Sequence, residues 1–106
     1  MENCIFCKIT SGQIDSTKVF EDEDVIAFLD VNPKALGHCL IIPKKHFENI
    51  FDIDQEILKK VMVATKNISI NIKKSPDITG VNLISNNGQG AGQEVFHFHL
   101  HIIPSY

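Results

Sequence analysis

The sequence predicts an α+β fold with a five-stranded, mostly antiparallel sheet, one long helix and one short helix. One long segment has apolar residues at helical spacing, and five short segments have the composition and turn residues of strands. Three of these strand segments precede the long helix and two follow it. Grouped strands of this kind favour α+β over the alternating order of an α/β fold.

Length and composition indicate one globular domain. The 106 residues can bury one modest core, so we expect a single domain over 1–106. A hydrophobic fraction of 43% is typical of a folded protein, and a net charge of −3 argues against nucleic acid as a partner. No apolar run approaches the roughly 20 residues of a membrane span. The start, MENCIFCKI, lacks signal-peptide features, so we expect a cytoplasmic protein with no membrane partner.

The first third of the chain predicts a helix and three strands. The segment CIFCKITSG predicts a short helix that buries Ile5, Phe6 and Ile9 and closes at Gly12. The segment KVFEDEDVIAFLD predicts a hairpin with strands at 19–21 and 25–29 around an acidic turn. The third strand, GHCLIIPK, has Pro43 at its end or at an edge position, because proline cannot donate to a ladder.

The long helix is predicted in DIDQEILKKVMVATKNISINIKK. Asp52 or Asp54 can cap its start, and Ser75-Pro76 ends it. TGVNLISN predicts a fourth strand, NGQGAGQ a glycine-rich loop, and EVFHFHLHII the last strand. The face of the helix expected to be buried consists of Ile57, Leu58, Val61, Met62, Thr65, Ile68 and Ile72.

The last predicted strand carries histidine at every second position. Side chains alternate along a strand, so His97, His99 and His101 are expected to share one face. The opposite face, expected in the core under the long helix, consists of Phe96, Phe98, Leu100 and Ile102. One alternative is a polar outer face without further function, although threonine, lysine or serine is commoner there.

A catalytic zinc held by all three histidines is a second alternative. Two residues advance a strand by about 6.5–7 Å, so the outer two histidines would lie about 13 Å apart at their backbones. Two neighbours could share one ion, but the third could not easily join them. A row of imidazoles suits a row of phosphate oxygens better, because a neutral middle histidine can attack phosphorus while its neighbours donate hydrogen bonds.

The glycine-rich loop before the histidines supports a phosphate ligand. Glycines let backbone N–H groups approach phosphate oxygens closely. On its own, NGQGAGQ is a weak signal, because glycine in a turn usually serves only geometry. Next to the histidine row, it favours phosphate binding.

The sequence HFHLHII matches the His-φ-His-φ-His-φ-φ signature (φ apolar) of the histidine triad (HIT) superfamily. CIFCKI, FLDVNPKALGHCLIIPKKH and AGQEVFHFHLHIIP each resemble a block of that family, in its order, so the resemblance covers nearly the whole chain. The chain looks like a bacterial-type member that resembles the purine nucleoside phosphoramidase branch. The resemblance implies the HIT fold, a nucleotide hydrolase or transferase acting on an α-phosphate, and a homodimer whose two five-stranded sheets join as one.

The resemblance also implies roles for individual residues. His99 resembles the nucleophile that forms a nucleotidyl-histidine intermediate, His101 a phosphate and leaving-group contact, and His38 a supporting histidine. Asp30 resembles the acid that binds the ribose hydroxyls, although an aspartate before Asn32-Pro33 is also typical of a turn. The remaining expected substrate contacts are Phe6, Ile9, Ile14, Phe28 and Val31 around the purine, which would otherwise be assigned to the core, and Asn86, Gly92, Gln93 and Glu94 in the phosphate loop.

The chain departs from the phosphoramidase branch at two points. Glu94 stands where that branch usually has serine, and the sequence ends five residues after His101, where the branch has a longer tail near the partner subunit's site. We expect a hydrolase that releases a nucleoside 5′-monophosphate, AMP, from a phosphoramidate or phosphoanhydride. A diadenosine polyphosphate hydrolase and a nucleotide-binding regulatory protein with incidental catalysis remain alternatives.

A structural zinc is expected at Cys4, Cys7, His46 and His97. Cys-x-x-Cys at the start of a short helix places two thiolates close together, and PKKH ends a strand that can bring His46 near them. Two buried, reduced cysteines are the alternative, and Cys39 is assigned to the core. Many bacterial-type family members carry the same Cys-x-x-Cys with a histidine at each matching place. No organic cofactor is expected.

Overall fold

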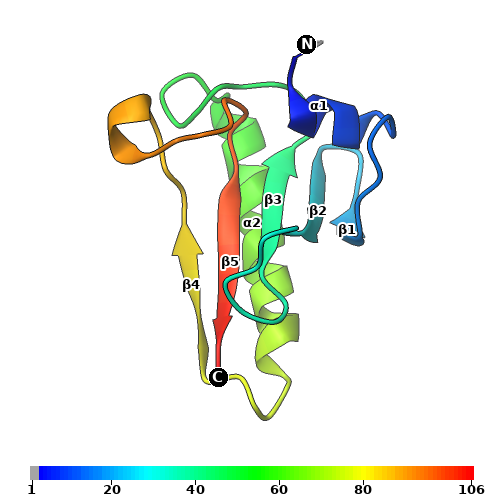
Figure 1. The fold of residues 1–106 in the computed structure, drawn as a ribbon, viewed down its shortest axis with the longest axis vertical. Coiled ribbons are helices and arrows are strands. Elements are labelled where there is room, and N and C mark those ends of the chain that lie inside the picture. Colours follow the sequence, from blue (N-terminus) through cyan, green and yellow to red (C-terminus); the bar gives the residue numbers. More distant parts are fainter. Residues whose placement is uncertain (1–2) are drawn as a thin grey trace.

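The computed structural model describes residues 3–106; Met1 and Glu2, which the single-domain prediction includes, lie outside the described residues. A five-stranded sheet with the order β1-β2-β3-β5-β4 forms the centre of the fold (Figure 1). Every neighbouring pair of strands is antiparallel, so the predicted sheet is confirmed. The elements are α1 (Ile5–Thr10), β1 (Lys18–Glu21), β2 (Val25–Leu29), β3 (Cys39–Pro43), α2 (Gln55–Lys73), β4 (Gly80–Ile84), the 3₁₀ helix η1 (Gln89–Ala91) and β5 (Leu100–Ser105).

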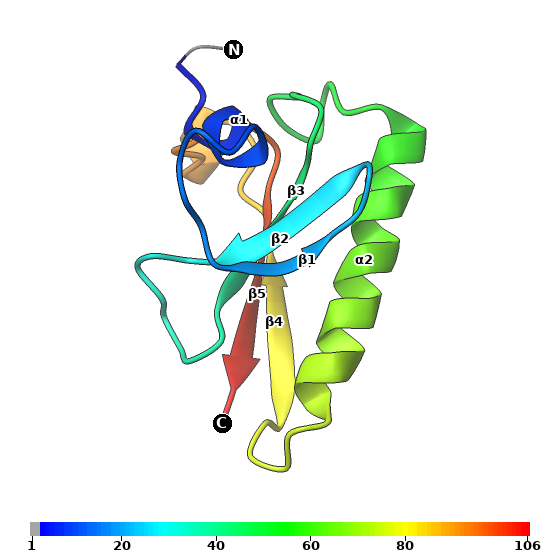
Figure 2. The same cartoon turned by 90° about the vertical axis from the view of Figure 1, so that its right-hand side faces the viewer.

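The two helices cover opposite faces of the sheet. Figure 2 shows α2 along one face and α1 on the other side, at the upper end. Alternate residues of β2 and β3 therefore enter two separate apolar clusters, one under each helix. The cluster under α2 includes Val25, Ala27, Cys39, Ile41, Phe98, Leu100 and Ile102. The cluster under α1 consists of Phe6, Ile9, Ile26, Phe28, Leu40 and Ile42.

The short helix and the hairpin follow the prediction closely. In α1, Phe6 and Ile9 are buried, but Ile5 is exposed, so its predicted burial was wrong. A helix of 6 residues presents only one narrow face to the sheet, and Ile5 lies off that face. The turn between β1 and β2 is fixed by Asp22, whose Oδ1 accepts the N–H groups of Asp24 and Val25, each at 2.8 Å.

The long helix begins at the predicted cap. The Asp54 side chain accepts the N–H of Ile57 at 3.1 Å, and the helix ends at Lys73, ahead of Ser75-Pro76. Val61 and Thr65 are fully buried against the sheet. Met62 is 41% exposed, so its predicted burial was wrong. One residue turns a helix by about 100°, which directs Met62 away from Val61 and toward a surface groove between α2 and β4. No helix within residues 3–106 is long and apolar enough to cross a membrane.

The last strand is shorter than predicted. It begins at Leu100, so His97 and His99 precede it and only His101 lies within it. The chain bends over 95–97, and the Phe98 N–H donates to the carbonyl of Phe47 at 2.7 Å instead of entering the sheet ladder. Phe96 is consequently exposed, which corrects its predicted place in the core, whereas the prediction for Phe98, Leu100 and Ile102 is confirmed.

Candidate active site and metal cluster

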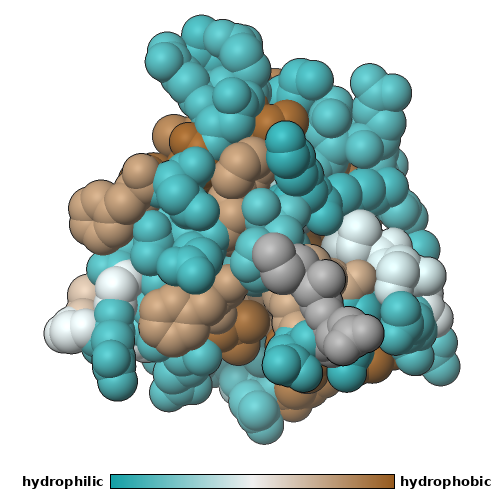
Figure 3. All heavy atoms as spheres, turned by 90° about the horizontal axis from the view of Figure 1, so that it is seen from above, coloured by the Kyte–Doolittle hydropathy of each residue, from teal (hydrophilic) through white to brown (hydrophobic). Residues whose placement is uncertain are grey.

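The histidines lie on the face of the sheet that α1 covers, beside two loops. The segment 44–54 and the glycine-rich loop 85–94 meet at the same end of the molecule as α1 (Figure 1). Figure 3 looks down on this end and shows apolar atoms set among hydrophilic ones. The groove of about 400 Å³ between α2 and β4 is a separate feature, because its lining contains none of the histidines.

The protonation of His99 is fixed by a backbone carbonyl. Its Nδ1 lies 2.8 Å from the carbonyl oxygen of His97, and an oxygen of this kind can only accept, so Nδ1 carries the proton. The Nε2 lone pair is then free. Burial lowers the pKa of His99 below its ordinary value, which keeps the ring neutral at pH 7. A neutral imidazole with a free lone pair can attack an electrophile such as phosphorus.

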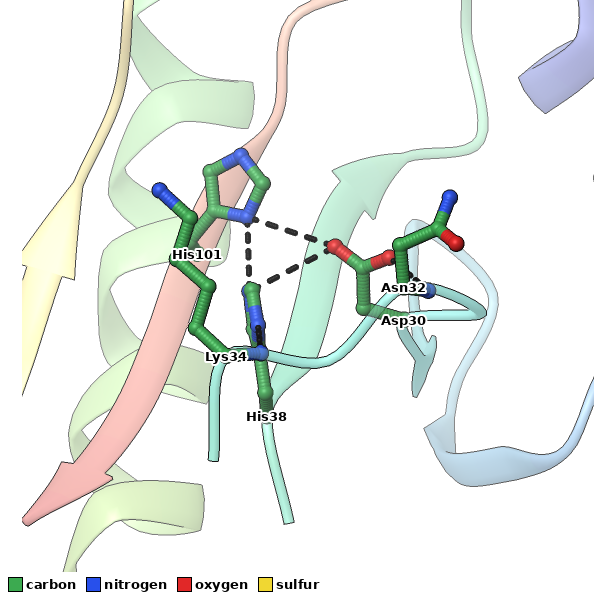
Figure 4. A network of polar contacts seen from close by, with 5 residues as sticks. All are labelled: Asp30, Asn32, Lys34, His38 and His101. Atoms are coloured by element: carbon green, nitrogen blue, oxygen red, sulfur yellow. Dashed lines mark hydrogen bonds and ion pairs between the residues drawn. The ribbon is translucent and has the colours of Figure 1, made fainter. Parts of the chain in front are cut away.

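A chain of hydrogen bonds fixes the protons of His38 and His101 (Figure 4). The backbone N–H of Lys34 donates to His38 Nδ1 at 3.0 Å, so His38 carries its proton on Nε2. That N–H donates to His101 Nδ1 at 2.9 Å, which leaves the His101 proton on Nε2. In Figure 4 the second ring nitrogen of His101 points away from His38 and Asp30. His101 can therefore donate a hydrogen bond to a group outside the chain.

His101 acts in this arrangement as a neutral donor. Burial, and then the neighbouring His99 and His38, lower its pKa to about 4. The Asp30 carboxylate lies 3.4 Å from His38 Nε2 and 3.7 Å from His101 Nδ1. These three side chains are close enough to hold a cation. However, His38 has no free lone pair, because its Nδ1 accepts the Lys34 N–H and its Nε2 is protonated, so a hydrogen-bonded network fits better than a metal.

The residues expected around a purine divide into two groups. Phe6 packs edge-on against Phe28 and the His99 ring, with ring centroids 5.6 and 5.2 Å apart, and Ile9 is buried in the same cluster. Ile14 and Val31 are exposed, and Val31 is 90% accessible. The first group forms a buried apolar wall that reaches His99 through Phe6, whereas the second is open to solvent.

Gln93 fastens the glycine-rich loop to the segment 44–54. Its Oε1 accepts the Gly88 N–H at 2.8 Å and the Asn49 amide at 3.3 Å. Its Nε2 donates to the carbonyls of Glu48 and Val95 at 2.6 and 3.0 Å. Its backbone N–H also donates, to the Gly88 carbonyl. Gln93 therefore has no donor left for a phosphate, and its hydrogen bonds hold the loop to the segment 44–54. The other expected loop contacts are Asn86 and Gly92, within the loop, and Glu94, which is exposed.

The expected zinc ligands lie together. His97 Nδ1 is 3.3 Å from Cys4 Sγ, 3.5 Å from Cys7 Sγ and 3.2 Å from His46 Nδ1. Cys7 Sγ is also 3.4 Å from His46 Nδ1. With Zn–S of about 2.3 Å and Zn–N of about 2.0–2.1 Å, a tetrahedron has S···N edges of about 3.5 Å and an N···N edge of about 3.3 Å. His97 Nε2 donates to the Pro43 carbonyl at 2.7 Å, which leaves Nδ1 unprotonated and able to bind a cation.

Several residues that support the site could not be identified from the sequence alone. The Ser85 hydroxyl donates to the His99 carbonyl at 2.9 Å, and Asn87 donates to Ser85 Oγ at 3.0 Å. Asn87 also accepts the Ile50 N–H at 2.7 Å, which ties the two loops together. The run Asn86-Asn87-Gly88 signals only a turn, so no local pattern identifies these contacts.

Comparison with known proteins identifies the family of the chain. A model of the HIT domain matches residues 11–106. "Protein hit" of Bacillus subtilis is 50% identical over 105 residues, which cover 99% of this chain and 72% of that protein. An adenylylsulfatase, HINT3 of Arabidopsis thaliana, is 39% identical over 102 residues, covering 96% of this chain and 52% of that protein.

Solved structures show the same relationship. A HIT family protein from Bacillus anthracis is 50% identical with a TM-score of 0.95, covering 99% of this chain and 74% of that one. A zinc-bound histidine triad family protein from Mycobacterium smegmatis is 33% identical with a TM-score of 0.94, covering 99% and 76%. The chain belongs to the HIT domain family, whose members are generally nucleotide hydrolases or transferases.

Proposed function

We propose that the protein releases a nucleoside 5′-monophosphate, AMP, from a phosphoramidate or phosphoanhydride through a nucleotidyl intermediate on His99. The observation that carries this proposal is the hydrogen bond from His99 Nδ1–H to the His97 carbonyl, at 2.8 Å. It leaves the Nε2 lone pair free on a neutral ring. The adenylylsulfatase among the relatives supports an adenylyl group as the part that is transferred.

The reaction follows in two displacements. His99 Nε2 attacks phosphorus, a P–N bond forms, and the bond to the leaving group breaks with its electron pair. The leaving group takes a proton from solvent, and the neutral His101 would donate it a hydrogen bond from Nε2–H. Water then attacks phosphorus and gives up one proton to solvent, the P–N bond breaks, and His99 recovers its lone pair. Backbone N–H groups of the loop 85–94 would bind the phosphate oxygens.

The other substrate contacts follow from the same assignment. We assign the ribose hydroxyls to Asp30 and the purine to the wall formed by Phe6, Ile9 and Phe28. Ile14 and Val31 are exposed and would cover the outer side of the base. Asn86, Gly92 and Glu94 would face the phosphate and leaving group. Gln93 contributes indirectly, because all its hydrogen-bonding groups support the loop.

We propose further that Cys4, Cys7, His46 and His97 bind one structural zinc ion. The spacing of the four donor atoms and the unprotonated Nδ1 of His97 support this assignment. A bound zinc would fasten α1 to the segment that carries His99. The zinc-bound relative supports the choice of metal.

The decisive test of the catalytic proposal is the fate of His99. His99→Ala should abolish release of AMP from an adenosine phosphoramidate and from diadenosine polyphosphates, while AMP affinity changes far less. Wild-type protein mixed with substrate and quenched should carry an adenylyl group on His99 by mass spectrometry. An adduct on His97 or His101, or unchanged turnover in the variant, would contradict the assignment. Binding without any turnover by the wild type would indicate a nucleotide-binding protein instead.

A further inference from the structure

Cys4 and Cys7 occupy the first turn of α1, where their sulfurs lie close together. Cys4 is the N-cap of the helix, and its Sγ accepts the Cys7 N–H at 3.3 Å. All four donor atoms of the cluster lie within 4.8 Å of one another. Both cysteines are half-buried, so small reagents can reach them, whereas Cys39 is buried in the core. The two thiols are therefore both near each other and accessible.

Two short routes connect these sulfurs to His99. The first runs through His97, whose ring lies 3.3 Å from Cys4 Sγ and whose carbonyl accepts the His99 Nδ1–H at 2.8 Å. The second runs through Phe6, which stands between the two cysteines in the sequence and packs against the His99 ring, with centroids 5.2 Å apart. A displacement of Cys4 or Cys7 therefore acts on both supports of His99.

We propose that the Cys4–Cys7 pair is an oxidation site for peroxides, whose disulfide releases the metal and withdraws the supports of His99. This inference rests on the metal cluster and the role of His99 proposed above. A reduced cytoplasm, the compartment expected from the sequence, keeps such a pair as thiols and can restore it after oxidation.

The oxidation balances with a peroxide as the only reactant besides protons. One thiolate attacks a peroxide oxygen, so an S–O bond forms, the O–O bond breaks, and the departing hydroxide takes a proton to become water. The second thiolate attacks that sulfur, an S–S bond forms, and the oxygen leaves as a second water. The pair loses two electrons, which reduce the peroxide. The disulfide sulfurs are neutral and only about 2.0 Å apart, so they cannot hold the cation and move away from His97.

The experiment uses the zinc-loaded protein and hydrogen peroxide added in stoichiometric steps. A chromophoric chelator measures released zinc, and mass spectrometry of the peptide covering residues 1–8 measures loss of two hydrogens. The ¹⁵N chemical shifts of the His99 ring report which nitrogen carries the proton. Cys39→Ala is the matched control, because it removes a cysteine that is distant from the cluster. Zinc content and the His99 adduct are measured before peroxide is added, so a failure of the proposed function is recognised separately.

We expect one zinc released per disulfide formed, in the wild type and in Cys39→Ala alike. The His99 Nδ1–H signal should lose its hydrogen-bonded position, and turnover should fall at least about tenfold, because a wrong tautomer of a catalytic histidine costs up to about 10⁴. Dithiothreitol followed by zinc should restore the hydrogen-bonded His99 signal and the turnover. Thiols that survive an excess of peroxide, zinc retained by the disulfide form, or His99 shifts that stay unchanged after oxidation would each overturn the inference.

Discussion

At the scale of single residues, the protonation states of His99, His97 and His38 depend on backbone groups that contact their rings. Carbonyls fix the proton on Nδ1 of His99 and on Nε2 of His97, and an N–H group fixes the acceptor nitrogen of His38. His101 then receives its donor from His38. Because backbone groups do not change their roles with pH, this pattern is built into the fold and does not depend on a neighbouring charge.

The lowered pKa of His101 leads to a prediction of how stability depends on pH. Its pKa is about 4 in the folded protein and about 6.5 in the unfolded chain, so between these values only the unfolded chain binds the proton. The free energy of unfolding should therefore fall as the pH drops from about 6.5 to about 4, by up to about 3 kcal/mol from this residue. His101→Gln keeps an acceptor facing His38 but does not titrate.

Urea unfolding at several pH values measures this contribution. The free energy of unfolding of His101→Gln should decline less steeply with falling pH than that of the wild type. Both proteins keep the metal cluster and all carboxylates, so their contributions cancel in the comparison. Equal slopes for the two proteins would mean that His101 is protonated in the folded state and cannot be the neutral donor.

The sequence predicts which residues form the site far better than it predicts the protonation states of the histidines. The His-x-His-x-His spacing and the Cys-x-x-Cys pair point to residues that the structure brings together. The tautomers depend on contacts such as Pro43 with His97, which lie 54 positions apart. Local sequence patterns cannot show contacts between residues so far apart in the chain. For the same reason, Gln93 was expected to contact phosphate, and its burial in the loop support could not be foreseen.

At the scale of elements, the glycine-rich loop depends on one buried amide. Gln93→Ala would leave the Gly88 N–H and the carbonyls of Glu48 and Val95 without their present partners. Unpaired groups of this kind cost about 1–3 kcal/mol. We expect that loss in the free energy of unfolding, together with faster hydrogen exchange at Gly88 and lower turnover. Gln89→Ala is the matched control, because Gln89 is exposed in the same loop, and it should stay within about 0.5 kcal/mol of the wild type.

The anchoring of α1 gives a second prediction at this scale. Cys4→Ser should lose zinc and lower the melting temperature by more than about 10 °C, because a helix of 6 residues has little stability of its own. Serine is a good N-cap, so the helix keeps its cap and the effect reports the metal. Elemental analysis should find about one zinc per wild-type chain and per Cys39→Ala chain. Wild-type protein free of metal, or zinc retained after both Cys4 and Cys7 are replaced, would exclude the site.

At the scale of the whole molecule, the order of the elements was predictable, because buried residues recur at the spacing of a helix or a strand. The spacing of Val61, Thr65 and Ile68 identifies α2, and the acidic turn at 22–24 identifies the hairpin. The late start of β5, at Leu100, was not predictable. It results from hydrogen bonds to loops that the sequence places elsewhere, including the bond between Phe98 and Phe47.

The sheet has an open edge beside an apolar groove. Among the described residues β4 is an edge strand, and Leu83 and Ile84 are exposed on it. Beside β4 lies the groove of about 400 Å³, to which Met62 and Ile70 of α2 contribute. Unpaired N–H and C=O groups next to exposed apolar side chains form a template for a second chain. We propose a two-fold dimer in which β4 pairs with its copy, so that two five-stranded sheets continue as one.

Sedimentation at micromolar concentration should give twice the chain mass of 11.9 kDa. Leu83→Lys should shift the equilibrium to the monomer, because each subunit would bring a charged lysine into the apolar interface. Val19→Lys is the matched control: Val19 is similarly exposed, at 45%, but lies on β1 at the opposite edge of the sheet. It should remain dimeric. A wild-type monomer that is stable and active would refute the dimer, and a monomer produced by Val19→Lys but not by Leu83→Lys would assign the interface to the β1 edge.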